Sequence, residues 1–396
     1  MPEPLRIVLG VSSGIAAYKT PELVRLLRRR GVEVKVAVTP SAAALVGPDA
    51  LRTVSGHPVY RDGAASEYDM DHIRLAEWGQ WYVICPATAN TLAKIAHGIA
   101  DNLVTTLALS FERRLAVVPA MNSAMWTNAV TQRNVELLRQ QGVRVLPVED
   151  GELACGGRGP GRMLDIETVA GYVAALGQGA LLAGRRVLIA SGPTQEPLDP
   201  VRVITNRSSG RMGAALAAGA WAMGAQVTVV SGPSAVPPPS GVRRIDVTTA
   251  AEMQAALEKE FKSADVCIMA AAVSDYRPAK ASAGKIKRGK GAGMTLALAP
   301  TADILEGLGR RKGRRFLVGF ALETGRGMDE ARRKLTAKHC DMLVLNYVDT
   351  SLGLATAQAT ILYTAGEPET LPAMDKTALA GRILTRVAER MGPADG

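Results

Sequence analysis

Short apolar runs alternate with helical stretches along the chain, and this pattern occurs once in each half. In the first half it predicts strands at Arg6–Gly10, Glu33–Thr39, Trp81–Cys85, Leu115–Pro119 and Val143–Pro147. In the second half it predicts strands at Arg186–Ala190, Gln226–Val230, Val266–Ala270, Phe316–Phe320 and Met342–Asn346. Since helices separate these strands, each half is predicted to form a parallel sheet that binds ligands at the carboxyl ends of its strands.

Each half opens with an apolar strand, a turn rich in Gly and Ser, and a helix. The first such unit runs from Arg6 to Thr39 and the second from Arg185 to Gly232. Glycine lets the backbone turn sharply, and the N-terminus of the following helix offers free N–H groups to an anion. The chain is therefore expected to fold into two α/β domains, residues 1–180 and 181–396, each with a phosphorylated ligand.

Three segments have an unusual composition. Tyr172–Gly184 is rich in Gly and Ala and is expected to link the two domains. The predicted helix Gly213–Gly224 consists almost entirely of Ala and Gly, which allows a close approach of helix and sheet. Lys280–Met294 is basic, rich in Gly and poor in groups that could enter a core, so it predicts a mobile lid or a disordered loop.

Composition narrows the classes of partner. The chain has 396 residues, of which 47% are hydrophobic, and this is enough for two cores. Its net charge of +10 favours anionic ligands. Only 4% of the residues are aromatic and they do not alternate with basic ones, so nucleic acid is not expected as a partner. No signal-peptide pattern and no apolar run of membrane length occur, so we expect a cytoplasmic protein that makes no membrane contact.

The cysteines are widely spaced, which argues against disulfides and structural zinc. They are Cys85, Cys155, Cys267 and Cys340. Cys155 differs from a buried structural thiol because it lies in the Gly-rich segment Glu152–Met163. We expect it to be a reactive thiol on a flap, where Arg158 and Arg162 could lower its pKa or hold an anion.

Polar side chains follow predicted strands of the first half. Thr88, Asn90 and Thr91 could contact a ligand at the sheet edge or cap a helix. Asn122 could present its amide to a carboxylate, although an Asn in a turn is more common. A lone His such as His72 is also more often structural than catalytic. No HxH or HExxH spacing occurs, so a catalytic metal held by protein ligands is not expected.

Two features resemble short-chain dehydrogenases but do not belong to one site. Gly10–Ala16 resembles their cofactor turn, and Tyr276 and Lys280 have the spacing of their catalytic pair. That pair requires a continuous helix, which Pro278 would break, and it lies in the other half of the chain. We therefore reject a dehydrogenase, which would require bound nicotinamide.

Longer motifs carry a family resemblance. CPATANT at Cys85–Thr91 resembles the PASANT motif of flavin-containing cysteine decarboxylases, with Thr88 in place of Ser. PAMNSAMW at Pro119–Trp126 fits their PXMNXXMW motif, and ACGGRGPGRM around Cys155 resembles their substrate-recognition clamp. In the second half, SGPTQEPLDPVRVITNRSSGRMG, AAVSDYRPA and KIKRGK resemble phosphopantothenate–cysteine ligases. The order of these motifs is that of the bifunctional coenzyme A biosynthesis enzymes of bacteria.

The resemblance implies a flavodoxin-like or Rossmann-like decarboxylase domain followed by a Rossmann-like ligase domain. It implies that the ligase joins 4′-phosphopantothenate to cysteine, using CTP and Mg²⁺ and forming an acyl-cytidylate. The decarboxylase would then use FMN to convert 4′-phosphopantothenoylcysteine to 4′-phosphopantetheine. Trimeric contacts of the first domain and dimeric contacts of the second would close into a homo-oligomer, for which the family expectation is a dodecamer.

The resemblance also implies residue roles. Cys155 would be the proton donor of the decarboxylase, His72 would assist oxidative decarboxylation, and Asn122 would hold the substrate carboxylate. In the ligase, Asn206 would bind the pantothenate end and the activated carbonyl, and Lys285 would neutralise the developing charge. The implied FMN contacts are Ser12, Ser13, Gly14, Thr39, Ser41, Thr88, Asn90 and Met121. The implied CTP contacts are Asp275, Lys285, Pro300, Thr301, Ala302, Asp303, Phe320, Lys334 and Lys338.

One stretch departs from the family pattern. Where the family commonly has Lys-Asn-Pro-Asp, this chain has Pro300-Thr301-Ala302-Asp303. Base or phosphate contacts from this loop could be weaker or use backbone groups, so the choice of CTP over another nucleotide is less strictly implied. An alternative from another class is a flavin-binding regulatory protein, since some relatives of the decarboxylase fold inhibit phosphatases. The intact clamp around Cys155 and the complete ligase half argue against this alternative.

Overall fold

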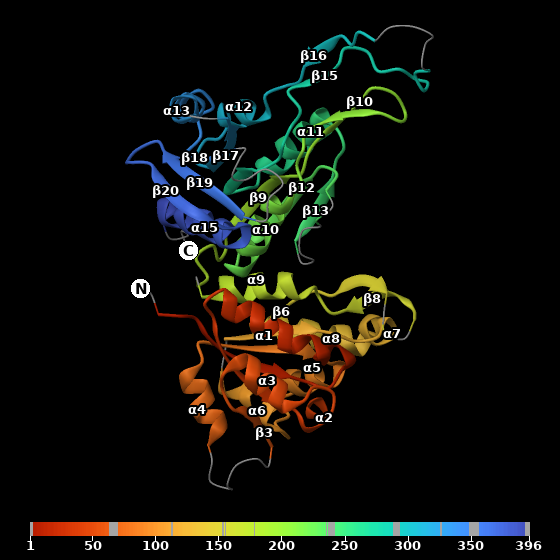
Figure 1. The fold of residues 1–396 in the computed structure, drawn as a ribbon, viewed down its shortest axis with the longest axis vertical. Coiled ribbons are helices and arrows are strands. Elements are labelled where there is room, and N and C mark those ends of the chain that lie inside the picture. Colours follow the sequence, from red (N-terminus) through yellow and green to blue (C-terminus); the bar gives the residue numbers. More distant parts are fainter. Residues whose placement is uncertain are drawn as a thin grey trace. The chain divides into compact units, whose positions relative to one another are not determined.

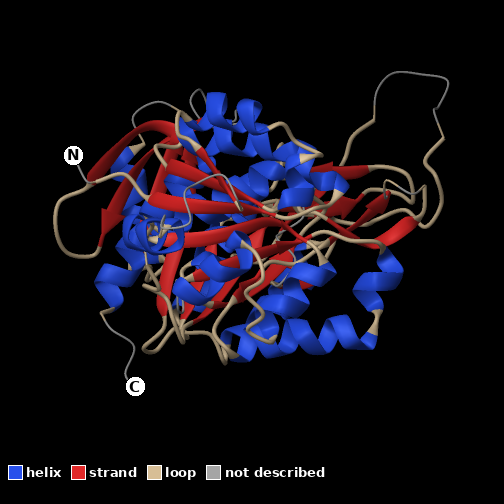
Figure 2. Ribbon diagram, turned by 90° about the horizontal axis from the view of Figure 1, so that it is seen from below, coloured by secondary structure: helices blue, strands red, loops and turns tan. Residues whose placement is uncertain are grey.

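A computed structural model describes residues 3–62, 70–111, 114–152, 154, 156–177, 179–234, 236, 242–287, 294–324, 327–347 and 356–392. The chain forms two compact units, Met1–Gly177 and Gln178–Gly396 (Figure 1). Both are mixed α/β structures in which helices alternate with strands (Figure 2).

The first unit is built on a parallel six-stranded sheet with the order β3-β2-β1-β4-β5-β6. Its strands are β1 (Arg6–Val11), β2 (Glu33–Val38), β3 (Val59–Arg61), β4 (Trp81–Ala87), β5 (Leu115–Pro119) and β6 (Arg144–Val145). The central strands β1, β4 and β5 are almost completely buried, as their continuous apolar runs predict. This strand order is the doubly wound arrangement in which ligands bind where the order reverses, between β1 and β4.

Helices connect the strands of the first unit. They are η1 (Ile15–Lys19), α1 (Thr20–Arg29), α2 (Pro40–Ala43), α3 (Pro48–Ser55), α4 (Asp71–Trp78), α5 (Ala89–Ala96), α6 (Leu103–Ser110), α7 (Ser123–Thr127), α8 (Ala129–Gln140) and α9 (Ile166–Leu176). A hairpin of β7 (Glu149–Glu152) and β8 (Arg158–Arg162) lies outside the sheet. The prediction of a linker beginning at Tyr172 is wrong at its start: Tyr172 is buried in α9, which ends at Leu176.

The second unit has an eight-stranded sheet with the order β13-β12-β9-β14-β17-β18-β19-β20. Its strands are β9 (Arg186–Ser191), β12 (Gln226–Ser231), β13 (Arg243–Asp246), β14 (Val266–Met269), β17 (Phe316–Glu323), β18 (Met342–Tyr347), β19 (Thr356–Tyr363) and β20 (Glu369–Asp375). Only the pairings of β19 with β18 and β20 are antiparallel. The helices are α10 (Arg211–Ala222), α11 (Ala250–Phe261), α12 (Ile304–Gly309), α13 (Met328–Ala337) and α15 (Lys376–Met391). The predicted α/β architecture is thus confirmed in both units.

An arm extends from the second unit (Figure 1). It consists of the hairpin of β10 (Gln195–Pro197) and β11 (Val203–Thr205), and of the antiparallel pair β15 (Tyr276–Pro278) and β16 (Leu298–Pro300). Tyr276 lies in an exposed strand and not in a helix, which agrees with the rejection of a dehydrogenase pair. Of the predicted lid Lys280–Met294, residues 288–293 lie outside the described residues.

Candidate active sites

Two loops of the first unit meet where the strand order reverses. Ser12 follows β1, and its hydroxyl donates a hydrogen bond to the Pro86 carbonyl oxygen at 2.8 Å. The same hydroxyl accepts a hydrogen bond from the Thr88 N–H at 3.1 Å. Ser12 is only 1% exposed, and its side chain joins the β1 and β4 loops.

The turn after Ser12 offers backbone donors. Among the described residues, the N–H groups of Ser13 and Gly14 donate to no protein group. Gly14 lies at the N-terminus of η1, in contact range of Thr88, since a Cβ there would lie 3.4 Å from the Thr88 Cγ2 atom. Free N–H groups at such a turn are suited to a phosphate.

The hydroxyl groups of two candidate FMN contacts cap helices. The Thr39 hydroxyl accepts a hydrogen bond from the Ala42 N–H at 3.2 Å, and the Thr88 hydroxyl accepts one from the Thr91 N–H at 3.3 Å. Thr88 therefore caps α5, as the simpler interpretation of this residue predicts. Two further candidate FMN contacts, Ser41 and Asn90, are exposed on α2 and α5.

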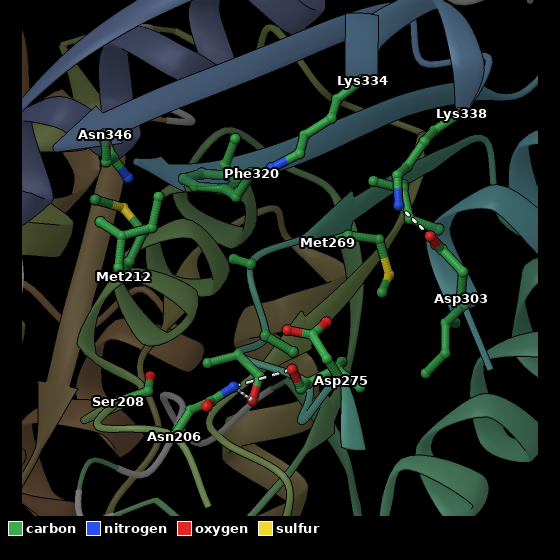
Figure 3. Close-up of a pocket in the computed structure, with 18 of the residues that line it drawn as sticks. Asn206, Ser208, Met212, Met269, Asp275, Asp303, Phe320, Lys334, Lys338 and Asn346 are labelled. Atoms are coloured by element: carbon green, nitrogen blue, oxygen red, sulfur yellow. Dashed lines mark hydrogen bonds and ion pairs between the residues drawn. The ribbon is translucent and has the colours of Figure 1, made fainter. Parts of the chain in front are cut away.

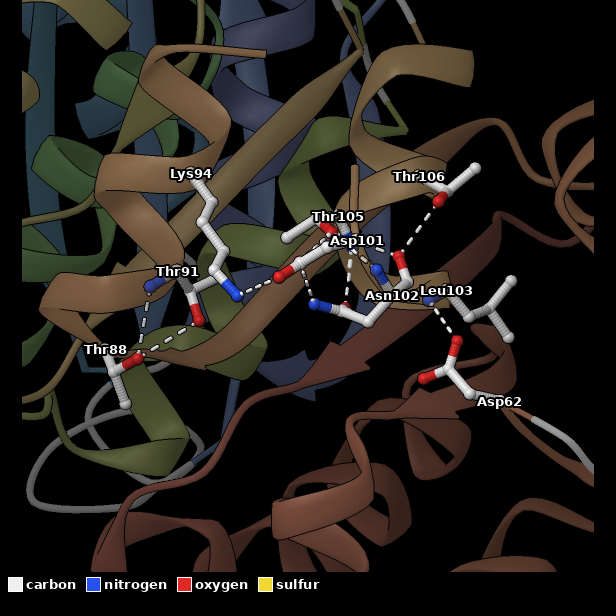
Figure 4. A network of polar contacts seen from close by, with 9 residues as sticks. All are labelled: Asp62, Thr88, Thr91, Lys94, Asp101, Asn102, Leu103, Thr105 and Thr106. Carbon is white, nitrogen blue, oxygen red and sulfur yellow. Dashed lines mark hydrogen bonds and ion pairs between the residues drawn. The ribbon is translucent and has the colours of Figure 1, made fainter. Parts of the chain in front are cut away.

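A polar network supports the helix that follows Thr88 (Figure 4). Lys94 on α5 forms an ion pair with Asp101 at 2.6 Å, and this hydrogen bond lowers the pKa of Asp101. Asn102 and Thr105 form a capping box at the start of α6. Asp62 accepts a hydrogen bond from the Leu103 N–H at 2.7 Å, so the start of α6 is tied to the segment after β3.

The loop after β5 lies against the β7–β8 hairpin. The Met121 N–H donates to the Gly161 carbonyl oxygen at 2.9 Å. A Cβ on Gly161 would lie 2.5 Å from the Met121 oxygen, so only glycine fits this approach. Asn122 is exposed, and its Oδ1 atom accepts a hydrogen bond from the Ala124 N–H at 2.8 Å. Cys155 lies outside the described residues, but β7 and β8, which flank it in sequence, bring this hairpin beside Asn122.

His72 lies in the first turn of α4 and is partly buried. Within the described part of the chain, no hydrogen bond or ion pair joins it to the other candidate residues of this unit. The structure thus brings together the β1 and β4 loops, and separately Met121, Asn122 and the hairpin. Among the residues that the structure describes, His72 makes no polar contact with either group.

The second unit contains a cavity of about 740 Å³ at the carboxyl ends of its central strands (Figure 3). It is lined by segments after β11, β14 and β16, by β17 and by α13. Its lining includes Asn206, Asp275, Thr301, Ala302, Asp303, Phe320, Lys334 and Lys338. Residues from at least five separate stretches of sequence therefore surround one space.

Two lysines of this cavity form ion pairs with carboxylates. Lys338 forms a hydrogen-bonded ion pair with Asp303, which also caps α12 by accepting from the Glu306 N–H. Burial alone would raise the pKa of Asp303, but the hydrogen bonds from Lys338 and the Glu306 amide lower it. Lys334 forms an ion pair with Glu323 at 2.6 Å. Both lysines are thus fixed at the cavity wall.

Asn206 reaches the cavity from the hairpin β10–β11. Its Nδ2 atom donates to the Val273 carbonyl oxygen at 3.0 Å and to the Ala272 oxygen at 3.4 Å. Thr301 joins the same region, because its hydroxyl donates to the Ser274 carbonyl oxygen at 2.5 Å. The amide oxygen of Asn206 is the group that these contacts leave for a ligand.

Two candidate CTP contacts do not line the cavity. Pro300 ends β16, and Lys285 is exposed on the arm. Conversely, the sequence reasoning missed Met212, Asn346 and Lys376, which do line it. Asn346 ends the predicted strand Met342–Asn346, so the rule that ligands bind at the carboxyl ends of parallel strands could have found it.

Two other kinds of site are absent from the described residues. No group of three or more His, Cys, Asp and Glu side chains there could hold a metal ion. None of the described helices combines the length and the apolar character that a membrane span requires.

Comparisons with known proteins cover both units. The family model described as Flavoprotein matches residues 1–177, and the model described as DNA/pantothenate metabolism flavoprotein C-terminal domain matches residues 182–391. Coenzyme A biosynthesis bifunctional protein CoaBC of Escherichia coli (strain K12) is 42% identical over 349 residues, 87% of this chain and 86% of that protein. The protein of the same name from Vibrio cholerae is 40% identical over 393 residues, 98% of each chain. That of Bacillus subtilis (strain 168) is 38% identical over 391 residues, 96% of each chain.

Proposed function

The chain belongs to the family of bifunctional coenzyme A biosynthesis enzymes, and we propose that its two units catalyse consecutive steps. The second unit joins 4′-phosphopantothenate to cysteine at the expense of CTP. The first unit then decarboxylates 4′-phosphopantothenoylcysteine to 4′-phosphopantetheine. The observation that carries this proposal is the gathering of Asn206, Asp275, Lys334 and Lys338 around one cavity.

The ligase step must bring two anions together. In the proposed reaction the carboxylate of 4′-phosphopantothenate attacks the α-phosphorus of CTP, and pyrophosphate leaves. The amine of cysteine then attacks the acyl carbon of the acyl-cytidylate, and CMP leaves. Lys334 and Lys338 supply positive charge at the cavity, and Mg²⁺ binds mainly through the phosphates of CTP.

The other ligase residues orient the reacting groups. The amide oxygen of Asn206 is turned away from the Val273 and Ala272 carbonyls that hold its nitrogen, so it can accept a hydrogen bond from the pantothenate end. Thr301, Ala302 and Asp303 approach the base or ribose from the segment after β16. Lys285 on the arm stabilises the charge that develops at the α-phosphate.

The first unit fits a flavin mononucleotide. The free N–H groups of Ser13 and Gly14 can bind one phosphate, and Thr88 lies at the same edge of the sheet. When bound, a flavin would accept two electrons from the cysteinyl group so that its carboxylate could leave, and it would return them to the decarboxylated product. Asn122 orients that carboxylate, His72 assists proton removal, and Cys155 returns a proton to the product.

The chromophore tests this assignment. This unit has one glycine-rich turn at its strand-order reversal, which offers a site for one phosphate group. We therefore expect the purified protein to be yellow and to release FMN on heating, as judged by chromatography against FMN and FAD standards. Release of FAD or of a nicotinamide would contradict the assignment.

The regulatory alternative is less well supported. A flavin-binding regulator would have no use for the ligase unit, yet the Vibrio cholerae relative matches 98% of the chain across both units. Release of pyrophosphate that requires both cysteine and CTP separates the enzyme from such a regulator. A cytoplasmic location and a dodecamer remain predictions.

A further inference from the structure

A buried carboxylate lies in the turn of the hairpin β10–β11. The side chain of Asp199 is 0% exposed. Its Oδ1 atom accepts hydrogen bonds from the N–H groups of Val201 and Arg202, both at 2.8 Å. Its Oδ2 atom accepts from the Arg202 guanidinium at 3.2 Å and from the Ile286 N–H at 3.1 Å. One oxygen thus shapes the turn, whereas the other reaches a segment far away in the sequence.

Ile286 is held at both of its backbone polar groups. Asp199 accepts from its N–H, and the Arg202 guanidinium donates to its carbonyl oxygen at 3.1 Å. The Ser282 N–H donates to the Leu198 carbonyl oxygen at 2.9 Å, so the same turn also holds the chain a few residues earlier. Lys285 lies between these two anchoring points and immediately before Ile286.

The hairpin that holds Ile286 continues into the cavity. β11 ends at Thr205, and the next residue is Asn206, which lines the cavity of the second unit. One short hairpin therefore carries Asn206 at its base and binds the backbone beside Lys285 at its turn.

We propose that Asp199 is the positioning residue that sets the place of Lys285 through its hydrogen bond to the Ile286 N–H. The inference rests on the proposed function of Lys285 in the ligase reaction. Asp199 touches no substrate and acts only through the backbone of the arm. The expected consequence is that Asp199 controls the turnover rate of the ligase and leaves the binding of CTP nearly unchanged.

The chemistry of the site requires an anion there. Three N–H groups and one guanidinium point at Asp199, and an ionised carboxylate is an acceptor at both oxygens. Burial alone would raise the pKa of Asp199, but these amide hydrogen bonds lower it. An amide in its place could keep the Oδ1 contacts, but its NH₂ group would oppose the Ile286 N–H and the Arg202 guanidinium.

The test is Asp199→Asn in the full-length protein, with Glu196→Gln as a matched control. Glu196 is another buried carboxylate of this hairpin and is 4% exposed. Its Oε1 atom accepts a hydrogen bond from the Ala250 N–H at the start of α11, and not from the segment beside Lys285. We expect Asp199→Asn to lower the kcat of CTP-dependent ligation about 100-fold, since small displacements of a catalytic group have effects of this size. The KM for CTP and the decarboxylation of added 4′-phosphopantothenoylcysteine should change little in both variants.

Double variants separate positioning from general damage. If Asp199 acts through Lys285, Asp199→Asn should cause no further loss in a Lys285→Gln background. A further loss there, or an unchanged kcat in Asp199→Asn alone, would overturn the inference. The proposed function fails separately, namely if Lys285→Gln keeps full ligase activity.

Discussion

Cys155 is the residue on which the decarboxylase proposal depends most. As the proposed proton donor to the decarboxylated intermediate, it should act late in the reaction. Cys155→Ser should therefore still release carbon dioxide but accumulate the oxidised ene-thiol product, whereas His72→Asn should stall before carbon dioxide is lost. Mass spectrometry of the products distinguishes these outcomes. Normal formation of 4′-phosphopantetheine by Cys155→Ser would show that the proton comes from elsewhere.

Other residue roles could be read from sequence only in part. Asp275 and Lys338 were implied by resemblance as CTP contacts, and both line one cavity of the second unit. The buried hydroxyl of Ser12 shows the limit of such reasoning, because its bonds to Pro86 and Thr88 depend on how two distant loops meet. A sequence pattern indicates a polar group at a strand end, but not which partner it finds in the fold.

At the scale of elements, the approach of β8 to the β5 loop is testable. Gly161 has φ +127°, and a Cβ there would lie 2.5 Å from the Met121 oxygen. Gly161→Ala should displace the hairpin that leads to Cys155 and lower the decarboxylation rate about 10- to 100-fold. Ligation by the same protein serves as the internal reference.

Gly98→Ala is the matched control for this change. Gly98 also has a positive φ, +69°, but a Cβ there would meet nothing within 4 Å. It should therefore cost stability through backbone strain alone and keep decarboxylation near the normal rate. Equal losses in both variants would mean that the close approach at Gly161 has no special role.

The junction of β20 and α15 predicts a pH dependence of stability. Arg386 on α15 contacts both oxygens of Glu369 on β20 at 2.7 Å, and Tyr363 donates to the same carboxylate. The hydrogen bond from Arg386 lowers the pKa of Glu369 although burial opposes this. A carboxyl group with a lowered folded-state pKa stabilises the fold above its unfolded-state pKa and loses this contribution as the pH falls through the folded-state value.

Glu369→Gln should accordingly reduce the free energy of unfolding at pH 7 by about 1 to 2 kcal/mol. The difference from the unaltered protein should shrink as the pH is lowered below the ordinary pKa of Glu, 4.5. Urea unfolding across this pH range measures it, with exposed Glu367→Gln as the control. A difference that is independent of pH would contradict the assigned ion pair.

The central strands of both sheets were predictable from the chain, whereas β13 and the short strands of the arm were not. The apolar runs of β1, β4, β9 and β14 predicted central strands because both of their faces are covered. β13 reads Arg-Arg-Ile-Asp and lies at a sheet edge, so no apolar pattern marks it. The strands of the arm were equally unpredictable because they are short. The arm is held by contacts between segments far apart in sequence, such as the hydrogen bond from the Ile286 N–H to Asp199.

At the scale of the whole molecule, assembly should be coupled to cofactor binding. Ile15 and Tyr18 are 61% and 63% exposed, and both lie in η1 directly after the proposed phosphate turn. Apolar side chains so exposed beside the proposed flavin site fit the expected contact between protomers of a trimer.

Tyr18→Asp should weaken the oligomer and lower its FMN content. Analytical ultracentrifugation with absorbance in the flavin band measures both, and a monomer that keeps FMN and both activities would exclude the predicted assembly.

The central claim is that one chain carries two independent active sites that act in sequence. The most direct measurement supplies 4′-phosphopantothenate, cysteine, CTP and Mg²⁺ to the purified protein and follows all products by mass spectrometry. We predict 4′-phosphopantetheine, carbon dioxide, pyrophosphate and CMP in equal amounts. Lys285→Gln should form these products about 100- to 1,000-fold more slowly, yet it should still decarboxylate added 4′-phosphopantothenoylcysteine at the normal rate, whereas Lys287→Gln should behave like the unaltered protein. Absence of the products from the unaltered protein, or loss of both reactions in Lys285→Gln, would contradict the claim.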